Sequence, residues 1–251
     1  MSYALEICAA SLASALAAQA GGAHRIELCQ NLEQGGITPS YGLIRQVRAQ
    51  VSLPVFVLIR PRPGGFVYDA NELAIMRDDI VACRELGCAG VVLGALDAAG
   101  RVDQAACQKL IEAAGPLEIT FHRAFDACPN QPQALEDVIA LGCQRLLTSG
   151  GQPTAEAGQA QLAALVAQAA GRIRVMPGAG ITAGNVRALA TRTGAQEFHA
   201  SAKRTVPPEP AAGLFAAARW ETDAALVADL AAELTRATSP PGPLSLGRGG
   251  A

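Results

Sequence analysis

A strand-like run, a helical stretch and a glycine recur along this chain at roughly 30 residues per unit, the spacing of a βαβ repeat. Glycines that suit a left-handed helix stop precede the next run at Gly21, Gly87, Gly142 and Gly194. The eight runs are short, apolar and β-prone, and they span Leu5 to Ala9, Arg25 to Leu28, Val55 to Ile59, Gly90 to Leu93, Glu118 to Phe121, Arg145 to Thr148, Arg174 to Pro177 and Glu197 to Ala200.

Helix start signals lie between the runs. Ser11 precedes the helix expected over Leu12 to Ala20, Thr38 stands before Pro39 in the first helical position, and Asn71 precedes Glu72 to Leu86. Eight such units predict a parallel sheet closed into a single (β/α)8 TIM barrel. A doubly wound open sheet is the alternative, but no second composition zone accompanies the even series of eight units.

Composition narrows the class of protein. Half of the 251 residues are hydrophobic, 17% are charged and the formal net charge is -2, so a buried core is available. Because the chain is not basic and no apolar run reaches membrane-spanning length, we expect no nucleic-acid or membrane partner. Seven cysteines without a leading signal segment indicate the reducing cytoplasm. The barrel is expected over residues 1–237 and a disordered tail over 238–251. The three prolines between Thr205 and Pro210 predict an extended connection there. A homodimer is one expected assembly.

The chemistry of such a barrel lies where the strands end, and these ends are unusually polar here. We expect the following side chains and turns at the mouth: Glu6, Cys8, Glu27, Cys29, Arg60, Arg62, His122, Arg123, Asp126, Ser149, Gly150, Gly178, Gly180, His199 and Ser201. His24 is expected at the opposite end of the barrel. The other five cysteines are expected to be small core residues.

Glu6 and Glu27 sit inside strands, where a buried carboxylate needs a partner. Arg60, Arg62 or Arg123 are the expected partners. An internal ion-pair network and a catalytic role, with His122 as a further acid-base group, are equally good interpretations.

Two other patterns at the strand ends indicate ligands. Cys8 and Cys29 follow neighbouring strands on one side, and two thiolates there can bind a soft ion such as Cu(I). The glycine turns at Gly150 and Gly178 to Gly180 suit an anion, and Thr182 is placed to cap the helix that begins near Asn185. A dinucleotide fingerprint and turns that need glycine only for backbone reasons are the alternatives.

Several strings in one order from Leu5 to Ser201 resemble the CutC family of copper homeostasis proteins. They are Glu6-Ile7-Cys8, Arg25-Ile26-Glu27-Leu28-Cys29, Gly35-Gly36-Ile37-Thr38-Pro39-Ser40, Ile59-Arg60-Pro61-Arg62, Thr120-Phe121-His122-Arg123-Ala124-Phe125-Asp126, Leu147-Thr148-Ser149-Gly150 and Pro177-Gly178-Ala179-Gly180-Ile181. The resemblance implies a cytoplasmic TIM barrel linked to copper tolerance, with Cys8 and Cys29 at the positions proposed as copper ligands. Gln34, Pro63 and Phe66 depart from the family pattern around the loops after the second and third runs.

Two functions from different classes follow. The first is a copper-associated barrel with Cu(I) held by Cys8 and Cys29. The second is an enzyme acting on a small phosphorylated or carboxylated metabolite, with Glu6, Glu27 and His122 as acid-base groups and Arg60, Arg62 and Arg123 as anion clamps. Asp126, Ser149, Gly150, Gly178, Gly180, His199 and Ser201 complete the expected anion site.

Overall fold

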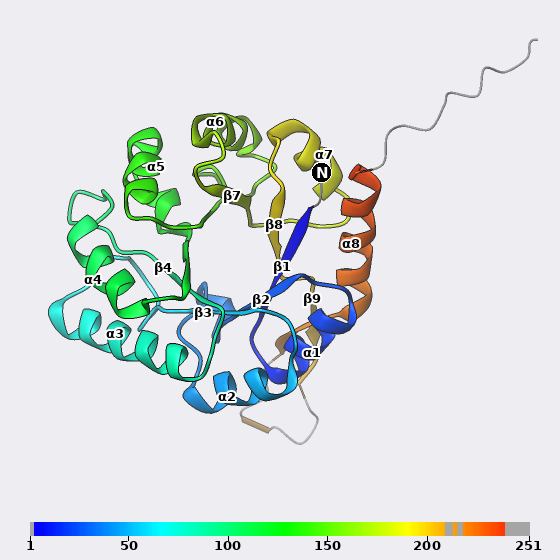
Figure 1. Ribbon diagram of the computed structural model, residues 1–251. Helices are drawn as coiled ribbons and strands as arrows, with labels where there is room; N and C mark the ends of the chain where they lie inside the picture. Colours follow the sequence, from blue (N-terminus) through cyan, green and yellow to red (C-terminus); the bar gives the residue numbers. More distant parts are fainter. Residues whose placement is uncertain (1–2, 209–212, 215–217, 239–251) are drawn as a thin grey trace, which may run out of the picture.

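A computed structural model describes residues 3–208, 213–214 and 218–238, in which a ring of helices surrounds eight parallel strands (Figure 1). The strands are β1 (Ala4–Ala9), β2 (Arg25–Leu28), β3 (Val55–Leu58), β4 (Gly90–Leu93), β5 (Glu118–Phe121), β6 (Arg145–Thr148), β7 (Arg174–Pro177) and β8 (Glu197–Ala200). The α-helices are α1 (Leu12–Ala20), α2 (Tyr41–Gln50), α3 (Ala70–Glu85), α4 (Gln104–Ala114), α5 (Gln131–Ala140), α6 (Gln159–Ala169), α7 (Val186–Thr193) and α8 (Ala224–Thr238). The predicted barrel is confirmed.

The strands pair in the order β7-β6-β5-β4-β3-β2-β1-β8, and every one of these pairs is parallel. The register sets Glu6 of β1 opposite Arg25 of β2 and His199 of β8, and it sets Cys8 opposite Glu27. β7 and β8 lie next to each other in Figure 1, but no ladder joins them in the described part of the chain. Pro177 of β7 has no N–H to give to such a ladder.

Two helices begin at residues other than those expected, and a third begins near Asn185 as expected but without the expected cap. α2 begins at Tyr41, and its first turn is capped by the Ser40 hydroxyl instead of beginning at Pro39. α3 begins at Ala70, because Asp69 accepts from the N–H groups of Asn71 and Glu72 while the Glu72 carboxylate accepts the Asp69 N–H.

α7 begins at Val186 after the N-cap Asn185. The N–H of Thr182 donates to the Asn185 side chain, so Thr182 stands before the turn and does not cap the helix.

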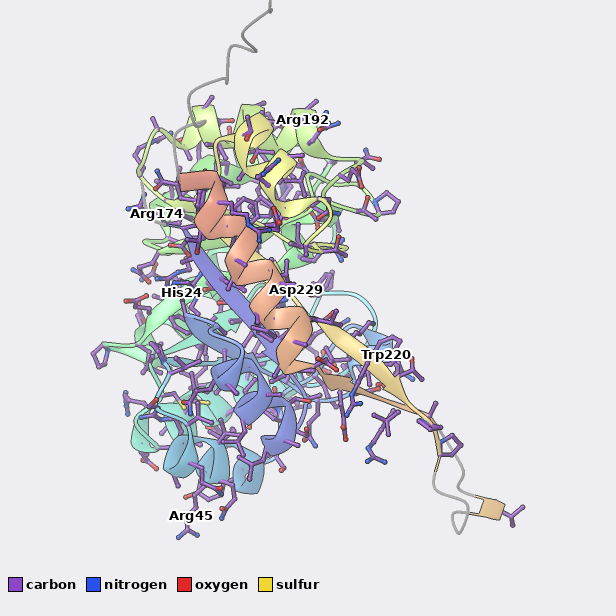
Figure 2. The ribbon with its side chains drawn as sticks, turned by 90° about the vertical axis from the view of Figure 1, so that its right-hand side faces the viewer. His24, Arg45, Arg174, Arg192, Trp220 and Asp229 are labelled. Carbon is purple, nitrogen blue, oxygen red and sulfur yellow. The ribbon has the colours of Figure 1, made fainter. Side chains whose placement is uncertain are left out.

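A hairpin follows β8 before the last helix. β9 (Lys203–Val206) pairs antiparallel with β10 (Arg219–Thr222), and the hairpin, which carries Trp220, projects from the barrel in Figure 2. The expected extended connection from Thr205 is therefore partly a paired strand, and its residues 209–210 lie outside the described part. α8 ends at Thr238, and the rest of the expected tail, residues 239–251, also lies outside the described residues.

Apolar side chains form two separate clusters. The larger one fills the layer between the strands and the helices, from Leu5 and Ile7 to Leu234. The smaller one lies inside the barrel and consists of Cys8, Cys29, Phe56, Leu58 and Val92. In the described residues no helix has the length and apolar character needed to cross a membrane.

Candidate functional site at the barrel mouth

Charged side chains occupy the end of the barrel interior where the strands begin. Arg25 donates from Nε to Glu6 at 2.6 Å and from a terminal nitrogen to Glu197. Arg145 donates to the same Glu197 oxygen at 2.9 Å and also pairs with Glu118. The Phe56 ring lies under both guanidinium groups, 5.7 Å from Arg25 and 5.1 Å from Arg145. The partner of Glu6 is thus Arg25, and the expectation of Arg60, Arg62 or Arg123 was wrong for Glu6.

Glycine makes room for this arrangement. A side chain at Gly90 would place a Cβ atom 2.3 Å from the Phe56 ring, so only glycine there lets Phe56 extend across the interior. Phe56 is buried, and it separates the lower charges from the mouth above.

Glu6 also connects the lower charges to the mouth through His199. The Nδ1 atom of His199 lies 2.7 Å from Glu6, and its Nε2 atom lies 3.5 Å from Glu27. Burial opposes ionisation of Glu6, but the hydrogen bond to His199 and the Arg25 charge lower its pKa to about 2. Burial opposes protonation of His199, but Glu27, Cys8 and Glu6 raise its pKa well above the usual value. His199 therefore carries the positive charge between two carboxyl groups.

Glu27 differs from Glu6 because it forms no ion pair with an arginine among the described residues. It is 6% exposed, and burial raises its pKa to about 7 although the His199 charge acts in the opposite direction. Its carboxyl group can therefore exchange a proton near neutral pH, which is the property of a general acid or base.

Cys8 and Cys29 are brought together as expected. Their sulfur atoms lie 3.6 Å apart, and both residues are buried and free of disulfides. Together with Glu27 they place three possible ligand atoms within 4.8 Å of one another. The hydrogen bond to Cys29 and burial raise the pKa of the Cys8 thiol well above its ordinary value. Gly36 lies beside Cys29, and a Cβ atom at Gly36 would be 3.7 Å from Cys29 and only 2.8 Å from Leu58.

Arg60 enters the same mouth from the end of β3. It is 6% exposed, and its terminal nitrogens donate to the carbonyl oxygens of Gly36 at 2.8 Å and Gly64 at 2.7 Å. Its Nε has no hydrogen-bond partner, and the nearby Tyr68 hydroxyl is likewise unpartnered. Among the described residues no carboxylate forms an ion pair with Arg60. The mouth thus holds a buried positive charge that carbonyl dipoles and the Phe66 ring stabilise, with no carboxylate among the described residues paired to it.

His122 follows β5 and is 5% exposed. Its Nδ1 accepts the N–H of Ala124 at 3.2 Å, so the neutral ring carries its proton on Nε2. That Nε2–H has no partner in the described structure. Burial and the Arg60 charge lower the pKa of His122 to about 3. His122 is therefore a neutral hydrogen-bond donor and not a proton acceptor at neutral pH.

These groups line one cavity of about 150 Å³. Its wall joins the thiols and Glu27 to Arg60 and His122, with His199, Arg123 and the apolar side chains of Leu32, Leu58, Phe66 and Leu147. A wider cavity of about 580 Å³ adjoins it, shares Cys8 and His199, and is lined also by Gly180, Ser201 and the apolar residues Leu226 and Leu230 of α8.

The turn after β6 is held by Asp126. Its carboxylate accepts from the Thr148 hydroxyl at 2.5 Å, from the backbone N–H of Ser149 at 3.0 Å and from that of Gly151 at 3.1 Å. The N–H of Gly150 donates to Thr148. The amides of this turn, which the sequence offers to an anion, are thus occupied by side chains of the chain itself.

Other predicted site residues either lie outside the cavity of about 150 Å³ or are already paired within the chain. Arg62 pairs with Glu72 and donates to carbonyl oxygens of its own loop, including that of Val67 at 2.9 Å. Arg123 lines the cavity but pairs with Asp126 at 2.7 Å. Gly178 packs against Leu147, where a Cβ atom would come within 2.6 Å of that side chain.

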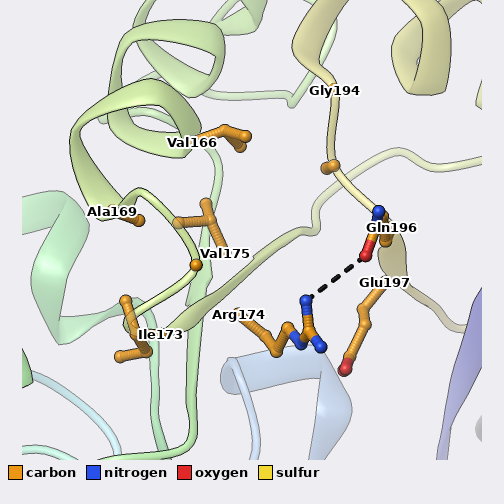
Figure 3. Close-up of a pocket in the computed structure, with 10 residues that line it drawn as sticks. Val166, Ala169, Ile173, Arg174, Val175, Gly194, Gln196 and Glu197 are labelled. Carbon is orange, nitrogen blue, oxygen red and sulfur yellow. Dashed lines mark hydrogen bonds between the residues drawn. The ribbon is translucent and has the colours of Figure 1, made fainter.

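A further pocket, of about 160 Å³, lies at the beginning of β7 and β8, where the two strands lack a ladder (Figure 3). Arg174 donates to Gln196 at 3.3 Å there, and Glu197 belongs to the lower ion pairs. In Figure 2, His24 and Arg174 lie at the end of the molecule opposite to Trp220. This pocket is separate from the mouth.

The sequence interpretation missed Arg25 and Phe66. Arg25 shares the inward side of β2 with Glu27 and Cys29, so strict alternation along the strand would have found it. Phe66 contacts both Arg60, at 5.0 Å, and the His122 ring, at 5.0 Å between centroids. No sequence pattern marks that loop residue as part of the wall.

The fold defines the chain as a (β/α)8 barrel with a polar mouth at the carboxyl ends of the strands, where barrels of this class carry their sites. The family model for the CutC family matches residues 3–204, and the chain belongs to that family. It is 58% identical over 206 residues to a CutC family protein of Xylella fastidiosa (strain Temecula1), covering 82% of this chain and 77% of the relative. A relative in Chromobacterium violaceum is 49% identical over 243 residues, covering 93% and 98%.

Solved structures agree with this assignment. The crystal structure of CutC from Streptococcus agalactiae has a TM-score of 0.75 and 36% identity, and the match covers 78% of this chain and 97% of that one. Thiamine phosphate pyrophosphorylase from Pyrococcus furiosus, at 17% identity and a TM-score of 0.60, shares the fold.

Proposed function

We propose that this protein binds one Cu(I) ion at the barrel mouth through the thiolates of Cys8 and Cys29. The observation that carries the proposal is the 3.6 Å separation of the two sulfur atoms inside one buried cavity. A bond from sulfur to a metal such as zinc is about 2.3 Å long, so both atoms reach a single ion without movement of the strands. Thiolates are soft ligands that suit Cu(I), and the name of the Streptococcus agalactiae relative is linked to copper homeostasis.

The surrounding charges support a monovalent ion. Two thiolates and one Cu(I) leave a single negative charge, and the positive His199 ring lies between Glu6 and Glu27 beside Cys8. Both thiols must lose their protons for binding, and the raised pKa of Cys8 makes this costly. Binding therefore releases protons and strengthens as pH rises. We place the protein in the cytoplasm, where thiols remain reduced.

The test is an anaerobic Cu(I) titration against a competing chelator. The unmutated protein should bind one ion, and the Cys8→Ser, Cys29→Ser double variant should bind none. Cys128→Ser is the matched control, since Cys128 is also buried and free but lies outside the mouth. X-ray absorption should show two sulfur neighbours on the ion. Full stoichiometry in the double variant would contradict the proposal.

A second function is favoured by the unpaired charge of Arg60, namely an enzyme acting on a small anionic metabolite. Its acid-base group is Glu27, which lines the cavity with a pKa near neutrality, while Glu6 is fully buried between Arg25 and His199. Product formation that Glu27→Gln abolishes, without loss of Cu(I) binding by the thiols, would establish this function instead.

A further inference from the structure

The starting observation is an excess of unpaired hydrogen-bond donors in one small cavity. His122 presents a buried Nε2–H without a partner, and Arg60 presents a buried guanidinium without a carboxylate in the described structure. Leaving such groups unpaired is costly, because burial removes the water that would otherwise solvate them. Both residues line the same cavity, and Phe66 contacts both.

The protein itself fixes the donor character of His122. The Ala124 N–H occupies Nδ1, and Gly94 allows the ring to lie close to the backbone, since a Cβ atom there would come within 2.7 Å of Nδ1. The proton must therefore reside on Nε2. Arg60 is fixed by the carbonyl oxygens of Gly36 and Gly64, which hold its charge in place without neutralising it.

We infer that the cavity between Arg60 and His122 binds a small monocarboxylate, which supplies the missing negative charge to Arg60 and the missing acceptor to His122 Nε2–H. The residues of this site differ from the proposed copper ligands, although the thiols line the same cavity. A ligand there would be held beside the Glu27 carboxyl group and any ion on Cys8 and Cys29.

Size and charge favour a carboxylate over a phosphate ester. A cavity of about 150 Å³ holds a molecule of roughly the size of benzene, so a sugar phosphate would have to extend into the adjoining wider cavity. A phosphate group carries about -1.5 to -2 charges and three acceptor oxygens, which exceeds one guanidinium and one imidazole N–H. Leu58, Phe66 and Leu147 line the rest of the cavity and suit a short aliphatic chain.

Nuclear magnetic resonance of the histidine rings tests the site in the unmutated protein. The chain has three histidines, and exposed His24 at the other end of the barrel is an internal reference. Sodium acetate, added to the metal-free protein at constant ionic strength, should shift the His122 Nε2 and Hε2 signals saturably and leave those of His24 unchanged. No saturable shift, or an equal response to sodium chloride, would overturn the inference.

Two variants separate this site from the copper proposal. His122→Phe preserves a ring but removes both the donor and the reporter signals, so acetate affinity is compared by titration calorimetry. It should fall about tenfold, the effect of one lost hydrogen bond to a charged group. The Cys8→Ser, Cys29→Ser variant should lose Cu(I) and keep acetate affinity. Unchanged acetate affinity in a folded His122→Phe protein would overturn the inference, even where Cu(I) binding is confirmed.

Discussion

The two ends of the barrel interior contain similar side chains in opposite states of pairing. At the end where the strands begin, Arg25 and Arg145 meet Glu6, Glu197 and Glu118, so that both of these inward guanidinium groups have a carboxylate. At the mouth, Arg60 meets carbonyl oxygens and the Phe66 ring but no carboxylate of the described residues, and the buried Nε2–H of His122 has no partner among them. Charged groups inside a barrel therefore do not all have one role. The lower ones hold the strands together, and the upper ones are available to ligands.

Phe56 and Glu6 mark the boundary between these regions. Phe56 lies against the lower arginines and belongs to the apolar cluster that contains both thiols. Glu6 accepts from Arg25 on one side and contacts His199 on the other. The internal-network interpretation is thus correct for Glu6, whereas Glu27 lies on the side of the mouth.

The largest expected effect comes from breaking the lower region. Arg25→Met should lower the free energy of unfolding by about 3–5 kcal/mol, because it leaves Glu6 and Glu197 buried with an uncompensated charge. Denaturant unfolding followed by circular dichroism measures the change. Arg77→Met, which breaks an exposed pair with Asp78, should have almost no effect. A loss no larger than that of the Arg77 control would show that the lower ion pairs do not stabilise the barrel.

Much of this arrangement follows from the sequence because strand ends in a barrel converge. The eight β-prone runs and the glycine stops suffice for the fold, and they place Cys8, Cys29, Glu27 and His122 at one mouth. These sequence patterns do not predict the stagger between neighbouring strands. The register brings Glu6, inside β1, opposite Arg25, the first residue of β2, and that offset depends on how the barrel closes.

The direction in which loop side chains point could not be predicted from the sequence either. Asp126 lies four residues after His122, and the sequence predicts it as a ligand-binding residue. In the structure its carboxylate instead accepts hydrogen bonds from the backbone N–H groups of Ser149 and Gly151. A carboxylate and a bound anion satisfy such amides equally well, so the pattern alone does not distinguish them. Only the path of the loop does.

A second, smaller effect concerns the pH dependence of the mouth. The pKa of His122 is about 3 in the folded protein and 6.5 in the unfolded chain. As pH falls from 6.5 towards 3, the unfolded chain binds a proton that the folded protein refuses, so stability falls by at most about 1.4 kcal/mol per pH unit. Glu27, with its raised pKa, acts in the opposite direction between pH 7 and 4.5.

The His122 contribution is obtained by comparison with His122→Phe in metal-free protein. The variant should lose less stability than the unmutated protein between pH 6.5 and pH 5, as measured by denaturant unfolding at each pH. If the free energy of unfolding changed with pH in the same way in both proteins, His122 would be solvated, or paired like the charges at the lower end of the barrel. The contrast between the two regions would then not hold.

The smallest expected effect distinguishes two arginines that lie two residues apart. Arg62 pairs with Glu72 and donates to the carbonyl oxygens of Gly65 and Val67, so it braces the outside of the loop whose Gly64 carbonyl accepts from Arg60. It does not line the cavity that Arg60 and His122 share. Arg62→Ala should therefore lower the melting temperature slightly and leave the acetate titration of the His122 signals unchanged. A loss of acetate affinity as large as that in His122→Phe would mean that Arg62, and not Arg60, supplies the positive charge of the site. The contrast between a paired lower region and an unpaired mouth would then be wrong.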